Sequence, residues 1–168
     1  QVITMLDCLR AMAEAEAENL AGKKILVIGT AFTANQALYP ETLQTALPGT
    51  PVATVAATKL ERSIARFQPI DSSDNSVFTT ELRQAIENSE VAILACTCFP
   101  MVKDILQEQF PCVVFLDPGA YCTGLLQESA DAQDRSLRVE VEGNVVSREQ
   151  VVEFAKSYLP SMPLTPHR

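Results

Sequence analysis

Residues 25–30 read ILVIGT, four consecutive apolar residues followed by a glycine and a threonine. A short continuous apolar run is typical of a strand that is buried on both faces of a parallel sheet. Three further runs of this kind lie at residues 52–57, 91–95 and 112–116. Patterns typical of helices separate them, and this alternation predicts a doubly wound parallel α/β sheet.

The helical patterns have recognisable ends. Residues 3–20 repeat apolar side chains every three or four positions, and Gly22 follows where such a helix would stop. Further apolar stripes lie at residues 82–86 and 101–106, and Pro100 stands at a favourable first position for the second of these. These segments are the expected partners of the strands.

The last third of the sequence predicts two more elements. Residues 137–141 alternate between apolar and polar side chains, as a half-exposed or edge strand does. Residues 147–150 form a capping box, and the apolar pattern at 151–159 predicts a helix after it.

Composition narrows the class of protein. The 168 residues are 47% hydrophobic and 20% charged, which is typical of a globular chain with its own core. No apolar run approaches the roughly 18 residues of a membrane span, so no membrane partner is expected. The net charge of −8 disfavours nucleic-acid binding, because an acidic chain repels phosphate backbones. The sequence starts at Gln1 rather than at methionine, so an upstream segment is expected.

The five cysteines are an odd number without the spacing of a small secreted framework: Cys8, Cys96, Cys98, Cys112 and Cys122. Reduced thiols in a cytosolic protein are the simplest interpretation. Four of them could be imagined around zinc, but the C-x-C spacing is unusual for zinc and the one histidine lies in the tail. No metal is therefore expected, and the usual glycine-rich nucleotide motifs are missing from the sequence.

Candidate site residues follow the predicted strands, because open α/β sheets bind ligands beyond the carboxyl ends of their strands. Cys96 lies between a strand and a helix start, where a thiol pKa falls toward neutrality; a buried core cysteine is the alternative. Cys98 is either a partner thiol or a packing residue. Thr30 and Thr33 could donate hydroxyls to a substrate or serve as helix caps. Asp117 could be an acid, although a strand-end cap is the simpler interpretation.

Taken in order, these stretches resemble the glutamate racemase family, within the aspartate/glutamate racemase superfamily. That family carries G-C-T-H-Y-P where residues 95–100 read ACTCFP, and A-T-x-x-T-x-x-S-x-x-Y where residues 29–39 read GTAFTANQALY. It carries I-D-S-G where residues 116–119 read LDPG. The strand and helix predicted at 137–141 and 151–159 resemble the end of the family pattern.

The resemblance implies a flavodoxin-like fold with helices on both faces, and racemisation of glutamate or aspartate without a cofactor. Two cysteines of the family move the α-proton, one on each side of the carbon. Cys96 matches the second of them, on the L-glutamate side, and Thr97 matches a residue that holds the substrate carboxylate. Thr30 and Thr33 match positions that line the pocket. The resemblance further implies a cytoplasmic enzyme, with a homodimer as a further expectation, that supplies D-glutamate for peptidoglycan.

The sequence also departs from the family pattern. The opening half-domain, with D-S-G and the C-N-T segment that holds the first cysteine, has no counterpart in these residues. Cys98 stands where the family has a histidine that assists the neighbouring cysteine, and Gln36 and Pro118 replace serines. Pro40 is expected to interrupt the helix that follows Thr33. The chain by itself is therefore expected not to racemise glutamate.

Three parts are expected along the chain. Residues 1–22 form an N-terminal helix and connector, and residues 23–110 form an α/β domain with the Cys96 motif. Residues 111–168 supply strand and helix elements that would complete the other racemase half-domain. Two alternatives stay open: a racemase of the superfamily acting on aspartate or a hydantoin, and a non-catalytic ligand-binding or interaction module on the same scaffold.

Overall fold

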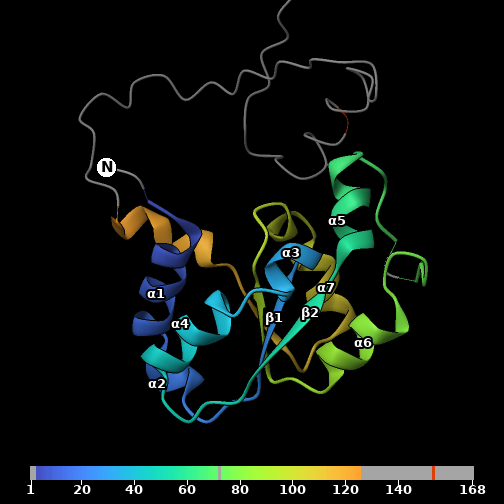
Figure 1. Cartoon of the computed structure of the whole chain (residues 1–168). Helices are drawn as coiled ribbons and strands as arrows, with labels where there is room; N and C mark the ends of the chain where they lie inside the picture. The colour runs from blue at the N-terminus through green and yellow to red at the C-terminus, as the bar shows by residue number, and fades with distance from the viewer. Residues whose placement is uncertain (1–2, 72, 126–152, 154–168) are drawn as a thin grey trace, which may run out of the picture.

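The sheet is parallel throughout and carries helices on both faces (Figure 1). A computed structural model of the chain describes residues 3–71, 73–125 and 153. The strands are β1 (Ile25–Gly29), β2 (Val52–Ala56), β3 (Val91–Leu94) and β4 (Val114–Leu116). They lie in the order β2-β1-β3-β4, and each neighbouring pair is parallel. The predicted α/β fold class is confirmed.

Central and edge strands differ in burial. Every residue of β1 and β3 is buried, as their continuous apolar runs predict. In contrast, β2 is an edge strand of the described sheet and exposes Ala53, Thr54 and Ala56. The prediction that this run is buried on both faces is wrong. Alanine and threonine expose little apolar surface, so an edge position costs them little hydrophobic free energy.

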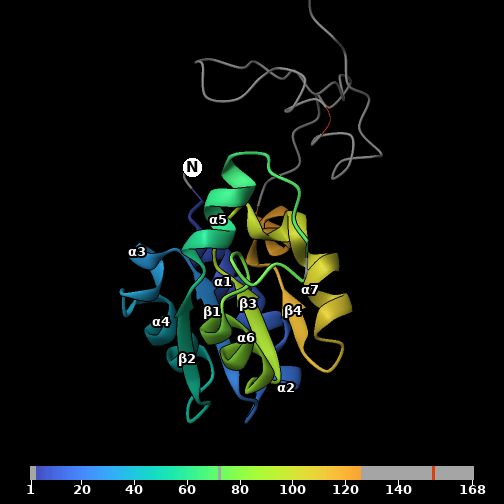
Figure 2. The ribbon, with the colours of Figure 1, turned by 90° about the vertical axis from the view of Figure 1, so that its right-hand side faces the viewer.

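Helical segments cover the two faces of the sheet (Figures 1 and 2). One face carries α1 (Met5–Ala15), α2 (Ala17–Leu20), α4 (Leu38–Ala46) and the 3-10 segment η2 (Pro118–Leu125). The other face carries α5 (Thr58–Ala65), α6 (Thr80–Glu87), the 3-10 turn η1 (Phe99–Val102) and α7 (Lys103–Gln109). The short helix α3 (Ala31–Ala34) follows β1 directly. Because neighbouring strand residues point to opposite faces, Val27 packs with the first group and Ile28 with the second.

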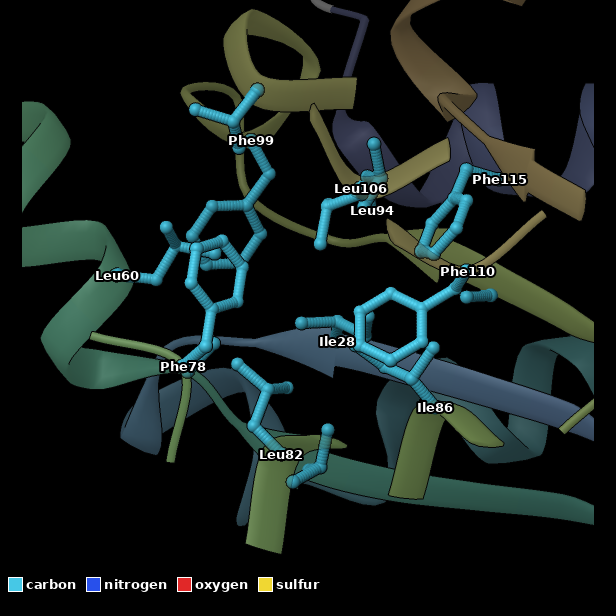
Figure 3. Close-up of a cluster of buried hydrophobic side chains, with 14 of the residues drawn as sticks. Ile28, Leu60, Phe78, Leu82, Ile86, Leu94, Phe99, Leu106, Phe110 and Phe115 are labelled. Carbon is cyan, nitrogen blue, oxygen red and sulfur yellow. The ribbon is translucent and has the colours of Figure 1, made fainter. Parts of the chain in front are cut away.

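The core under α5, α6 and α7 is rich in aromatic side chains (Figure 3). Phe78, Phe99 and Phe115 are all fully buried there. Burying one such ring stabilises the fold by about 1.5–3 kcal/mol. Phe99 matters most for the site, because it begins η1 and anchors the turn that precedes it in the core.

The helix predicted over residues 3–20 is two helices. Glu16 lies at the junction with φ −102° and ψ 13°, outside helical geometry. Gly22 then ends the second helix with a φ of 73°, which glycine adopts without strain. A second interruption lies between α3 and α4, where Asn35 caps α3. Pro40 follows within the first turn of α4, where a missing N–H breaks no helical bond.

Some predictions fall outside the described residues. These are the strand at 137–141, the capping box at 147–150 and the helix at 151–159. The three-part division of the chain stays a prediction, although β4 joins the same sheet as β3. Within the described part, no helix is long and apolar enough to cross a membrane.

Candidate functional site

Three of the predicted site residues lie at one edge of the sheet. Thr30, Cys96 and Asp117 come just after β1, β3 and β4, which are neighbours in the sheet. The register aligns Ile28 with Leu94, so β1 and β3 end side by side. We call this the carboxyl edge, and it is the edge where open α/β sheets bind their ligands. The structure therefore places these residues where the sequence predicts a site.

Cys96 and Cys98 form a close thiol pair at the carboxyl edge. Their Sγ atoms lie 3.4 Å apart. The main-chain N–H of Phe99 donates a 3.0 Å hydrogen bond to the carbonyl of Cys96 and closes the turn between them. Both thiols are partly buried and pack against the aromatic core, which holds them in this arrangement.

The two thiols of the pair differ in pKa. The Cys98 thiol donates a hydrogen bond that lowers the pKa of Cys96 to about 6, although burial opposes this. The main-chain N–H groups of Cys98 and Thr97 also donate to the Cys96 sulfur and lower its pKa further. The same contact with Cys96, together with burial, raises the pKa of Cys98 strongly. Of the two thiols, Cys96 is thus the one whose deprotonated form the hydrogen bonds favour.

This geometry bears on the alternatives for Cys96. A structural core cysteine is buried and inert, with a raised pKa. Cys8 fits that description, because it is only 3% exposed and burial raises its pKa. Cys96 differs from Cys8 in both respects: it is partly exposed, and hydrogen bonding, chiefly to Cys98, lowers its pKa. Its catalytic role stays a prediction.

The two threonines at the start of α3 act on each other. Thr30 caps α3, and its Oγ1 accepts a 3.3 Å hydrogen bond from the N–H of Thr33. Their hydroxyls also lie 3.2 Å apart. A Cβ added to Gly29 would lie 2.8 Å from two side-chain carbons of Thr33, so only glycine fits under this cap. Capping is therefore observed, and contact with a substrate stays a prediction.

The remaining predicted residues have different surroundings. Thr97 lies between the two cysteines in sequence and is exposed, and its contact with a substrate stays a prediction. Asp117 accepts a 2.8 Å hydrogen bond from the N–H of Gly119 and so caps the start of η2. This matches the strand-end cap that was the simpler interpretation of Asp117.

One charged neighbour of the thiol pair was not among the residues predicted from the sequence. Glu61, on α5, lies close enough for its charge to raise the pKa of both Cys96 and Cys98. No motif marks it, but α5 follows β2 directly, and β2 ends at the carboxyl edge. Tyr39 is also near the pair, because the charge of Cys96 adds to the effect of burial in raising the pKa of Tyr39.

In the described part of the chain, no cluster of three or more His, Cys, Asp or Glu side chains could hold a metal ion.

Comparison with known proteins gives one consistent result. The glutamate racemase of Streptococcus equi subsp. equi is 26% identical over 121 residues, which cover 71% of this chain and 46% of that protein. The structure superposes on glutamate racemase from Campylobacter jejuni with a TM-score of 0.66 and 19% identity, covering 95% of this chain and 63% of that one. A Francisella tularensis glutamate racemase in complex with D-glutamate gives a TM-score of 0.54 at 19% identity, covering 74% and 45%.

The chain thus resembles glutamate racemases in sequence and shares their fold. It spans about half the length of the curated relatives that it matches. No protein-family profile matches it.

Proposed function

We propose that the chain supplies one side of the active site of a glutamate racemase, with Cys96 as an acid/base group at the α-carbon. The observation that carries this proposal is the Cys96–Cys98 thiol pair at the carboxyl edge, whose Sγ atoms lie 3.4 Å apart in the turn just after β3. The similarity to glutamate racemases, one of them bound to D-glutamate, supports the choice of substrate.

The chemistry requires a base that can also return a proton. The Cys96 thiolate would accept the α-proton of L-glutamate and leave a carbanion at the α-carbon. A pKa of about 6 keeps Cys96 largely deprotonated at neutral pH, and the thiol formed is acidic enough to give the proton back. Inversion needs a second group on the far side of the carbon, which the family resemblance assigns to a cysteine in the half-domain without counterpart here.

The other site residues have proposed roles around this step. Thr97 would hold a substrate carboxylate, and the hydroxyls of Thr30 and Thr33 would line the pocket. Cys98 takes the place of the family histidine and would act by stabilising the Cys96 thiolate through its hydrogen bond. Asp117 would fix the turn that follows β4.

The wider setting follows the same resemblance. The enzyme would be cytoplasmic, would need no cofactor, and would supply D-glutamate for peptidoglycan. Residues 111–168 would complete the other half-domain beside the α/β domain of residues 23–110, with residues 1–22 as helix and connector. A homodimer is part of the same proposal.

Exchange of the α-proton in D₂O tests the proposal with this chain. L-Glutamate incubated with the protein should gain deuterium, as followed by NMR, and Cys96→Ala should abolish the gain. Cys112→Ala is the matched control, because Cys112 is exposed and lies outside the turn. If the protein neither exchanges the α-proton of glutamate nor binds glutamate, the proposal is contradicted. That result would favour a non-catalytic interaction module.

A further inference from the structure

We propose that Cys96 and Cys98 are a peroxide-sensitive pair that closes to a reversible disulfide. This modification site goes beyond the proposed racemase activity, since it needs only the two thiols and an oxidant.

The turn places the two thiols within reach of a bond. Their Sγ atoms are 3.4 Å apart, and a disulfide bond is about 2.05 Å long. Residues two positions apart have Cα atoms at most about 7 Å apart. A turn shortens this further, toward the roughly 4.4–6.8 Å that disulfides span. Here the 3.0 Å bond between Phe99 and Cys96 closes such a turn, so rotation of the two side chains can bring the sulfurs together.

The two cysteines also suit the two roles that disulfide formation requires, an attacking thiol and a resolving thiol. A peroxide is attacked by a thiolate, and the hydrogen bonds around Cys96 stabilise a thiolate there. Cys98 stays protonated beside it as the resolving thiol. Both are only partly buried, so a small oxidant can reach them.

The other thiol contact in the described structure makes a useful contrast. Cys8 also has a neighbouring thiol, that of Cys122, and hydrogen bonding to it raises the pKa of Cys8. Burial raises the pKa of Cys8 still more, and its side chain is almost completely enclosed. Both pairs therefore bring two thiols together, but the Cys96 pair is more accessible than Cys8, and hydrogen bonding lowers the pKa of Cys96 where it raises that of Cys8.

The reaction balances with hydrogen peroxide as the oxidant. The Cys96 thiolate attacks one peroxide oxygen and breaks the O–O bond, which gives a sulfenic acid at Cys96 and, after protonation, one water. The Cys98 sulfur then attacks the Cys96 sulfur and displaces the hydroxyl, which leaves as a second water with the Cys98 proton. Two electrons pass from the two sulfurs to the peroxide. A dithiol reductant reverses the change by exchange.

The oxidised turn has no thiolate. Any reaction that uses the Cys96 thiolate as a base stops while the disulfide is present and resumes on reduction. This consequence for catalysis rests on the proposed function, whereas formation of the bond does not.

Mass spectrometry of the whole chain tests the proposal. The reduced protein is treated with equimolar hydrogen peroxide, the remaining thiols are alkylated with N-ethylmaleimide, and the peptides are mapped. The peptide that holds both residues should lose two hydrogen atoms and carry no alkyl group, and dithiothreitol should restore two alkylation sites. Cys112→Ser should leave this result unchanged. Cys98→Ser should instead leave a sulfenic acid at Cys96, which dimedone traps.

Three outcomes of the wild-type mapping would overturn the proposal, and none depends on whether a variant folds. In the first, both Cys96 and Cys98 are still fully alkylated after peroxide treatment. In the second, Cys96 is oxidised to the sulfinic acid while Cys98 is still alkylated. In the third, a disulfide between Cys8 and Cys122 forms before any disulfide at Cys96. Because the readout is mass and no substrate is present, failure here is distinct from failure of the racemase proposal.

Discussion

The phenolic hydroxyl of Tyr121 donates a 2.7 Å hydrogen bond to Oε1 of Glu16, a residue 105 positions earlier in the chain. Glu16 lies at the junction of α1 and α2, and Tyr121 lies on η2. Since η2 begins next to Asp117, this bond ties the carboxyl edge of the sheet to the first helix of the described chain. Asn19 donates a second bond to the same carboxylate at 2.8 Å.

Replacing Tyr121 tests the strength of this tie. Tyr121→Phe should lower the free energy of unfolding by about 1 kcal/mol at neutral pH, the usual net worth of one hydrogen bond. The bonds from Asn19 and Tyr121 lower the pKa of Glu16, so their stabilisation exists above the ordinary pKa and fades as pH falls through the lowered one. Urea unfolding should therefore show the difference shrinking below about pH 4.

Glu16→Gln is the matched control, because it keeps an acceptor oxygen and removes the titration. In that background, the loss caused by Tyr121→Phe should no longer change with pH. In the background that keeps Glu16, the loss of unfolding free energy caused by Tyr121→Phe should change with pH. A loss that stays constant from neutral to acid pH would contradict this account of the bond.

Alkylation of Cys96 should have an unusual pH profile. Its rate should rise with a midpoint near pH 6, because the Cys98 thiol stabilises the thiolate. Cys98→Ala should move the midpoint upward by about 1–2 pH units, since a hydrogen bond to a charged group is worth about 1.5–3 kcal/mol. Glu61 and Tyr39 also face this thiol, and Glu61→Gln should move the midpoint slightly downward.

Peptide mapping after iodoacetamide labelling measures each cysteine separately. Exposed Cys112 serves as the internal reference in every sample. Faster labelling of Cys112 than of Cys96 in the folded protein at about pH 6–7 would refute a stabilised thiolate at Cys96.

The chain by itself should exchange the α-proton of glutamate without inverting the carbon. Cys98 shares one turn with Cys96, so the two thiols approach a substrate from the same side. Loss of one acid/base partner costs about 10²–10⁴ in rate, so inversion should be at least about 100-fold slower than exchange. Chiral chromatography of the deuterated product separates the two events. Inversion as fast as exchange would reveal a second base among residues assigned here to packing.

The cap at Thr30 gives a prediction for stability. Thr30→Ala should lower the free energy of unfolding by about 0.5–2 kcal/mol, because it removes the acceptor for the N–H of Thr33. Thr30→Ser keeps that oxygen and should restore most of the loss. Chemical denaturation measures both, and equal losses in the two variants would show that the Thr30 methyl group, and not its hydroxyl, matters.

The central part of the fold could be predicted from the sequence, because β1 and β3 are buried on both faces and their apolar runs show it. The edge position of β2 could not, since VATVA looks apolar in letters but carries small side chains that tolerate water. The break at Glu16 could not either, because no glycine or proline marks it and Tyr121, which bonds the Glu16 carboxylate, is distant in sequence.

The site shows the same division between local and distant information. The place of Cys96 after β3 follows from its motif, and the cap at Thr30 follows from its position after β1. The contact between the thiols depends on a turn whose residue Phe99 is buried in the core, and the approach of Glu61 depends on how α5 packs on the sheet. Neither is written in a local pattern.

The groups at the carboxyl edge come together over very different sequence separations during folding. One turn is enough to bring Cys96 and Cys98 together, whereas Thr30 comes to lie at the same edge only when β1 pairs with β3 across more than a third of the chain. Contacts between near neighbours form faster than contacts that close long loops. The thiol pair and the threonine cap can therefore each form by local closure, whereas their alignment at one edge waits for β1 to pair with β3.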